Sequence, residues 1–207
     1  MNGINEKEEK LTLELLNAID QRSDLSQRNL AQQMGIALGL TNSYLKRCAR
    51  KGLVKVSEAP ANRYLYYLTP KGFAEKARLT GRYLASSLAF YRQAGESCSV
   101  VFELCKKNKI ERILLCGVSE LSEIALIRAM DADIRITGIY DPESILDQLF
   151  SKPVWTDLTM VDEFDMCLLT DLNSPYEFYK SLINEIGKDR VLIPGVLGIT
   201  DKSEKLR

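Results

Sequence analysis

The sequence predicts a mixed α/β protein with two domains: a small helical domain that ends in a β-hairpin, followed by a domain built on a parallel sheet. Three observations lead to this prediction. Apolar residues recur at helical spacing near the N-terminus, two β-rich runs follow them, and strand-like runs alternate with helical stretches from residue 112 onward. The length of 207 residues fits one large domain or two small ones.

Three helices are expected in the N-terminal domain. Residues 8–22 carry an apolar stripe, and Ser26 then occupies the N-cap position of a short second helix, which Gly35 ends with a turn. A third helix is expected over residues 38–50, with apolar residues facing inward and polar and basic residues on its other face. Ala37 occupies its N-cap position, so this helix begins without a capping side chain.

Two β-rich runs, residues 53–57 and 63–68, then flank a turn-forming segment. Three helices followed by a hairpin is the order of a winged helix. A long helix is expected to begin at Pro70 and to run to about residue 93, and a further helix is expected near residues 97–107. Gly95, between the two helices, is expected to mark the domain boundary.

Charge is distributed unequally along the chain, although the 28 basic and 28 acidic residues cancel overall. Residues 1–94 contain 15 Lys and Arg against 8 Asp and Glu, a net +7, whereas residues 95–207 contain 13 against 20, a net −7. Such asymmetry indicates a polyanionic partner for the basic half. The alternative is an unevenly charged, solvated surface.

Four short runs identify the N-terminal domain more closely. They are SQRNLA at residues 26–31, KGLV at 51–54, NRYLYYLTPKG at 62–72 and EKA at 75–77. The stretch from Leu11 to about Leu84 that contains them resembles the MarR family of winged helix-turn-helix regulators, especially the subgroup associated with exopolysaccharide gene clusters. The resemblance implies a transcription regulator that binds double-stranded DNA. Ala37 departs from the family, which usually has Ser at that cap.

The resemblance places the third helix in the major groove of DNA. There the amide of Asn42 can make two hydrogen bonds to an adenine edge, and the hydroxyl of Ser43 can bond to several bases. Arg63, at the hairpin tip, is expected in the minor groove. Phosphates would be contacted by Arg28, Lys46, Arg47 and Lys51. The alternative for each residue is an ordinary solvated surface position.

The helix over residues 70–94 is expected to link the domains and to form a homodimer. In similar regulators a helix after the wing is commonly a dimerisation element, and a two-fold dimer matches a palindromic operator. The alternative is a helix that packs on the second domain. The expected organisation is therefore a DNA-binding domain at 1–69, the linking helix at 70–94 and a ligand-sensing domain at 95–207.

The C-terminal domain is expected to be a doubly wound parallel sheet. Strand-like runs and helical stretches alternate at residues 112–116 (strand), 123–130 (helix), 134–140 (strand), 164–169 (strand), 175–186 (helix) and 191–193 (strand). The pattern resembles a Rossmann-type nucleotide-binding domain, with its glycine-rich turn at residues 117–122 and Asp141 as the ribose-binding acid.

The expected nucleotide site contains Gly117, Ser119, Ser122 and Asp141. Only the first glycine of the fingerprint is present, and serine at 119 counts against a close approach of a pyrophosphate. A serine hydroxyl can instead donate to a single phosphate at a helix N-terminus. Asp141, which Pro142 follows, also suits a helix N-cap.

Two ligand classes are therefore considered, with no cofactor strictly required. A winged helix joined to a Rossmann-like domain resembles the NADH-sensing Rex repressors in architecture, which implies NAD(H). Sugar-modifying enzymes of polysaccharide pathways carry similar small Rossmann modules, which implies a nucleotide sugar.

Composition excludes several kinds of catalysis. The chain has no histidine, so neither Ser-His-Asp nor Cys-His catalysis nor a histidine-based zinc site is available. We therefore expect a regulator without catalytic residues or a metal. The alternative is a nucleotide- or sugar-nucleotide-processing enzyme with an accessory helix-turn-helix domain. Its acid–base candidates are Asp141, Glu143, Asp165, Asp171 and Tyr176.

The remaining features point to the cytoplasm. Five cysteines are widely spaced, as expected of reduced thiols, and Cys116 is expected in the core or, alternatively, as a redox sensor. No apolar stretch approaches the roughly 20 residues that span a bilayer, so no membrane partner is expected.

Overall fold

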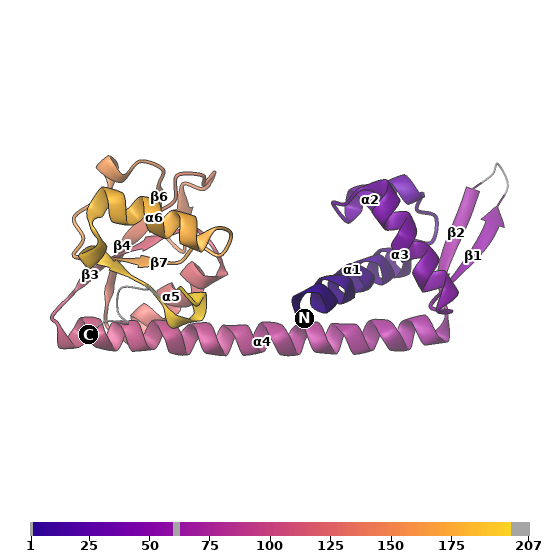
Figure 1. Ribbon diagram of the computed structural model, residues 1–207, viewed down its shortest axis with the longest axis horizontal. Coiled ribbons are helices and arrows are strands. Elements are labelled where there is room, and N and C mark those ends of the chain that lie inside the picture. The colour runs from indigo at the N-terminus through magenta and orange to yellow at the C-terminus, as the bar shows by residue number, and fades with distance from the viewer. Residues whose placement is uncertain (1, 60–62, 200–207) are drawn as a thin grey trace. The chain divides into compact units, whose positions relative to one another are not determined.

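The computed structural model describes residues 2–59 and 63–199, with side chains described from residue 7 onward except at positions 59 and 63. The chain forms two compact units, residues 1–88 and 89–207. The first is helical with a β-hairpin and the second has a parallel sheet with helices, which confirms the predicted mixed α/β class (Figure 1). Among the described residues, no helix is long and apolar enough to cross a membrane.

The N-terminal unit begins with three helices, α1 (Asn2–Gln21), α2 (Gln27–Gln33) and α3 (Leu38–Arg50). The bounds of α3 are those predicted, whereas α1 begins six residues before its predicted start. The hydroxyl of Ser26 caps α2 by accepting the N–H of Asn29 at 3.1 Å. Leu15, Leu16 and Leu30 are fully buried where the helices meet.

The hairpin consists of two antiparallel strands, β1 (Val54–Ala59) and β2 (Arg63–Leu68). Tyr66 anchors it to the helices, because its ring is buried, its N–H donates to the carbonyl of Ser23 at 2.9 Å and its hydroxyl accepts a hydrogen bond from Gln27 at 3.2 Å. The hairpin is therefore attached to the α1–α2 connection.

Helix α4 (Pro70–Lys107) is continuous, so the predicted interruption at Gly95 is wrong. A Cβ atom at Gly95 would lie 2.8 Å from Nε of Arg128. The glycine thus lies against the guanidinium of an arginine that is distant in the sequence, and it does not break the helix.

The sheet of the C-terminal unit has the strand order β5-β6-β4-β3-β7-β8, and neighbouring strands are parallel except for the antiparallel pair β5 and β6. The strands are β3 (Arg112–Cys116), β4 (Arg135–Tyr140), β5 (Gln148–Leu149), β6 (Lys152–Trp155), β7 (Met166–Leu169) and β8 (Val191–Leu192). The chain moves outward from β3 to β4 and β6, and then returns to β7 on the other side of β3. The order therefore reverses between β3 and β7, where α/β sheets commonly bind ligands.

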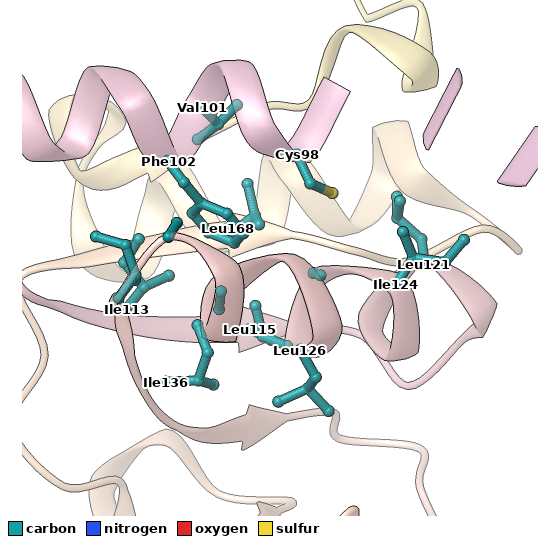
Figure 2. Packing of buried hydrophobic residues seen from close by; sticks show 14 of the residues in the cluster. Cys98, Val101, Phe102, Ile113, Leu115, Leu121, Ile124, Leu126, Ile136 and Leu168 are labelled. Atoms are coloured by element: carbon teal, nitrogen blue, oxygen red, sulfur yellow. The ribbon is translucent and has the colours of Figure 1, made fainter. Parts of the chain in front are cut away.

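Side chains alternate between the two faces of the sheet. Ile113, Leu115 and Leu168 face the C-terminal part of α4 and helix α5 (Glu120–Asp131), as Figure 2 shows. Leu114 and Leu169 face helix α6 (Pro175–Ile186) on the opposite side. Both faces are buried, which explains why β3 and β7 are nearly uniformly apolar in sequence.

Strands β5 and β6 were not predicted. They are short and their residues are half-buried or exposed, so they lack the apolar run that identifies β3. Trp155 at the end of β6 packs over Gly138, where a Cβ atom would lie within 2.2 Å of the indole ring. The connection from β6 to β7 contains only a 3₁₀ turn (Leu158–Met160).

The start of β3 is tied to the start of β7 by Asp165. Its carboxylate accepts hydrogen bonds from the guanidinium of Arg112 at 2.8 Å, from the N–H of Arg112 at 2.9 Å and from the N–H of Glu111 at 3.2 Å. These bonds, that of the guanidinium first, lower the pKa of Asp165 to about 2.

We predict that Asp165→Asn lowers the free energy of unfolding by about 1 kcal/mol at pH 7, since a partly exposed charged hydrogen bond is lost. The pKa of an unfolded Asp is about 3.9. The wild-type carboxylate therefore contributes its full stability above about pH 4 and loses it as the pH falls toward 2. Urea denaturation at several pH values measures this. A difference between the two proteins that does not narrow below pH 4 contradicts the prediction.

Candidate nucleic-acid interface and ligand pocket

The outward face of α3 is polar and basic. Thr41, Leu45 and Cys48 are buried, as predicted, whereas Ser43 and Lys46 are exposed. Arg50 is also exposed and continues the same outward face one turn further along. The helix thus presents a hydroxyl and two cations to solvent.

Asn42 lies at the edge of this face. Its side chain is half-buried, and its Oδ1 atom is enclosed without a hydrogen-bond partner in the described part of the chain. Recognition of adenine uses both the carbonyl oxygen and the amide nitrogen. Asn42 would therefore have to rotate before it could make the predicted pair of bonds.

Arg47 points toward α1. Its guanidinium donates to the carboxylate of Glu8 at 2.9 Å and lies 4.8 Å from the centre of the Tyr44 ring. These contacts hold α3 against α1. A phosphate contact from Arg47 would compete with Glu8.

The other predicted DNA contacts are distributed around α3. Arg28 is exposed in the first turn of α2, and Lys51 is exposed at the C-cap of α3. Neither they nor Lys46 forms an ion pair with a described residue. Arg63 begins β2, but its side chain and residues 60–62 of the hairpin tip lie outside the described parts. Lys55, exposed on β1, is a further candidate that sequence reasoning missed; alternation along β1 was the available signal.

Acidic residues of the N-terminal unit form ion pairs with basic residues of helix α4. Glu9 contacts Arg82 at 2.6 Å, Asp20 contacts Lys76, and Glu75 contacts Arg78 at 2.8 Å, all involving basic residues of α4. The acids thus leave the outward cations of α3 unpaired. Exposed cations that form no ion pair with a described residue thus follow one another from α3 into β1, namely Lys46, Arg50, Lys51 and Lys55.

In the C-terminal unit, Gly117 allows β3 to turn tightly beside β7. Its φ is +108°, and a Cβ atom would lie 2.5 Å from the backbone nitrogen of Asp171. The hydroxyl of Thr170 donates to the carbonyl of Gly117 at 2.7 Å. Glycine is required at this position by the close approach of the β7–α6 loop.

Ser119 and Ser122 close the N-terminus of α5. The Ser119 hydroxyl accepts the N–H of Leu121 at 3.1 Å and donates to the carbonyl of Thr170. The Ser122 hydroxyl accepts the N–H of Ser119 at 3.1 Å, which completes a capping box. Both hydroxyls predicted to contact a phosphate are therefore engaged within the protein.

Asp141 binds the same turn from β4. One carboxylate oxygen accepts the N–H of Val118 at 2.8 Å and the other accepts the N–H of Glu143 at 3.0 Å. The fold therefore brings all four predicted nucleotide-binding residues to one turn, where three of them bind backbone groups. No helix begins directly after Asp141, so this residue is not the helix N-cap that the sequence also allowed.

A cavity of about 590 Å³ opens beside this turn, at the carboxyl ends of β3, β4 and β7. Four of its lining residues are acidic, namely Asp141, Glu143, Asp171 and Glu177, and none is basic. Its apolar lining consists of Val118, Pro142, Ile145, Leu146 and Phe178. Asp141 was predicted as the ribose-binding acid, whereas Glu143 and Asp171 were considered only as acid–base candidates. Glu177 and Phe178 were not predicted, because nothing local shows that the start of α6 adjoins β4.

The remaining enzyme candidates lie apart from this cavity. Asp165 is at the opposite end of β7, and the exposed Tyr176 contacts Lys180. All five cysteines are buried. Burial raises the pKa of Cys98 to about 11 and that of Cys116 well above the usual range. Because the thiolate is the reactive form, neither cysteine has the environment of a redox sensor.

The N-terminal unit matches a known family. Residues 8–55, from α1 to the start of β1, match the family described as winged helix-turn-helix DNA-binding. Among curated proteins, no sequence matches the chain.

Three solved structures of regulators are partly similar. The PcaV transcriptional regulator from Streptomyces coelicolor, in complex with its natural ligand, is 25% identical over 47% of this chain and 72% of that chain, with a TM-score of 0.38. A MarR family protein of Mycobacterium tuberculosis in complex with p-aminosalicylic acid is 20% identical over 38% and 61%, with a TM-score of 0.35. FabT of Streptococcus pneumoniae in complex with DNA is 20% identical over 38% and 55%, with a TM-score of 0.32.

This chain spans less than two thirds of the length of the latter two proteins. It is the family match over residues 8–55 that assigns a winged helix-turn-helix DNA-binding domain to the N-terminal unit.

Proposed function

We propose that the chain is a cytoplasmic, dimeric transcription regulator of the MarR type, and not an enzyme. Its N-terminal unit binds an operator and its C-terminal unit senses a small ligand. The observation that carries the proposal is the winged helix-turn-helix match over residues 8–55, in which α3 presents Ser43, Lys46 and Arg50 to solvent without acidic partners.

In this proposal α3 occupies the major groove. Ser43 contacts base edges, whereas Lys46, Arg50 and Lys51 neutralise phosphates and so supply affinity without sequence preference. Arg28 reaches the backbone from α2, and Arg63 reaches the minor groove from the hairpin.

The proposed dimer forms through α4. Ala77, Gly81, Leu84 and Leu88 follow one another at alternating spacings of four and three residues, the pattern that aligns one face of a helix with a partner helix. Leu84 and Leu88 are 53% and 56% exposed in the single chain. Two large apolar side chains one turn apart, with small residues before them, suit contact with a second copy of the helix.

We predict that Lys46→Ala weakens binding to operator and scrambled duplexes by a similar factor and reduces the slope of log affinity against log salt by about 1, since one phosphate contact is lost. Ser43→Ala is expected to reduce the preference for the operator instead. Fluorescence anisotropy on the upstream DNA of the gene over a salt series measures both effects, with Lys10→Ala on α1 as the matched control.

If the wild-type protein shows no preference for its upstream DNA even at low salt, operator recognition is refuted. The alternative, an enzyme that processes a nucleotide or sugar nucleotide, then becomes the better hypothesis. The acid-lined cavity of the C-terminal unit is where its activity would be sought.

We predict that Leu84→Glu combined with Leu88→Glu converts the dimer to a monomer of 23.4 kDa, because the two carboxylates would be buried without partners. Sedimentation equilibrium measures the mass, and operator affinity is expected to fall with it. Ala85→Glu is the matched control, since it adds a charge at an exposed α4 position outside the 4–3 pattern. A double variant that remains dimeric places the interface elsewhere.

A further inference from the structure

The cavity at the carboxyl ends of β3, β4 and β7 differs in charge from a site for a dinucleotide or a nucleotide sugar. We propose that it binds a phosphate-free organic cation, a protonated amine attached to an apolar or aromatic group. The inference deepens the proposed function and rests on it, in that this cation is the ligand that the regulator senses.

The backbone N–H groups of the turn that would receive a phosphate already have acceptors within the protein. At a helix N-terminus an anion binds to unpaired backbone donors. Here the N–H of Val118 donates to Asp141, that of Ser119 to Ser122 and that of Leu121 to Ser119. A phosphate would have to displace internal acceptors, and no basic residue lines the cavity to attract it.

A largely buried carboxylate lies in the cavity wall. Asp171 is only 9% exposed, and one of its oxygens accepts the N–H of Ser174 at 2.6 Å. Its other oxygen, Oδ1, accepts no hydrogen bond from a described residue and is not fully enclosed, so it remains accessible at the cavity. A ligand ammonium group would supply this oxygen with both a donor and the opposite charge.

Glu143 and Glu177 add to the negative charge around Asp171. Glu143 is exposed, and its side chain forms no ion pair or hydrogen bond with a described residue. Glu177 lies 4.0 Å from Lys180, whose ammonium group also lies over the ring of Tyr176. The cavity is thus electronegative, which concentrates cations and repels phosphates.

Apolar side chains lie beside the acidic residues of the cavity. Ile145 is 97% exposed and Leu146 is 44% exposed on the loop that borders the cavity, and Phe178 of α6 also lines the cavity. Exposed apolar side chains at the rim of a cavity favour a ligand with an apolar part. The acidic residues then bind the ammonium group of the ligand, and these three side chains contact its apolar part.

Trp155 supplies a signal for the test. It is the single tryptophan of the chain, and its carbonyl accepts the N–H of Asp141 at 2.9 Å. Ligand binding at the cavity is therefore expected to change its fluorescence. The probes are three compounds of similar shape: 2-phenylethylamine (cation), 2-phenylethanol (neutral) and phenylacetate (anion), each titrated into the millimolar range against the full chain without DNA.

The amine is expected to give a saturable change, the alcohol a weaker one and the carboxylate none, with the amine's affinity falling as salt is raised. The proposal is overturned if the amine gives no saturable change, or if phenylacetate binds as well as the amine. Saturable binding of NADH or UDP-glucose that the amine competes away also overturns it and restores the nucleotide ligand.

Two variants locate the site. Glu143→Lys is expected to abolish amine binding and to create binding of phenylacetate, whereas Glu123→Lys, at an exposed position of α5 outside the cavity lining, should change neither. Asp171→Asn keeps an oxygen for the N–H of Ser174 and is expected to weaken amine binding at least about fivefold. Circular dichroism melting curves confirm that each variant is folded. Unchanged amine binding in both Glu143→Lys and Asp171→Asn would refute the site.

These measurements separate the inference from the proposed function. A protein that binds its operator but not 2-phenylethylamine refutes only the ligand class. A protein that binds the amine but shows no operator preference refutes the regulator and leaves the cation site intact.

Discussion

The contact between the turn that follows β3, at Gly117, and the loop between β7 and α6 determines how the strand ends of the C-terminal unit are arranged. At Gly117 the backbone has a φ of +108°, and the missing side chain leaves room for the backbone of Asp171. Once these segments touch, Thr170 can donate to Gly117 and Ser119 can donate to Thr170. The acidic cavity and the capped start of α5 both follow from this approach. A side chain at residue 117 would move the two loops apart and change them together.

Structural features that are set by neighbouring residues in the sequence could be predicted, whereas features that depend on contacts between distant residues could not. Helix α3 was predicted with its observed bounds because the spacing of its inward-facing residues and the glycine at position 52 both lie within one short stretch of sequence. The continuity of α4 was missed because Gly95 lies against the side chain of Arg128, which is 33 positions away. Strand β6 was missed because Trp155 is stabilised by Gly138 on a neighbouring strand. Local periodicity carries no information about such pairs.

In the candidate sites too, the sequence predicted which residues lie together but not the contacts that their side chains make. The sequence located the Gly117 turn, Ser119, Ser122 and Asp141, and the fold brings them together. What it did not reveal is that these groups satisfy one another. A serine at the start of a helix can cap the helix or bind a phosphate, and the same residue types serve both purposes. The orientation of Asn42 was unpredictable for a similar reason, because helical spacing places it at the edge of the outward face and tertiary packing decides its exposure.

The two units have opposite net charge, and their charged residues are arranged differently. In the N-terminal unit, Glu9 and Asp20 of α1 pair with basic residues of α4 rather than with Lys46 and Arg50 of α3, so these two cations remain available to a polyanion. In the C-terminal unit, four acidic residues line a cavity that has no basic lining residue, so DNA phosphates would be repelled there.

A ligand alters DNA affinity only if it binds two conformations of the protein unequally. Helix α4 is the element through which such a difference can act, because it is one continuous helix that contributes Leu79 to the core of the first unit and Phe102 to that of the second. In the proposal the dimer face lies on that same helix, so a ligand-linked change in the C-terminal unit would have to reach it through α4.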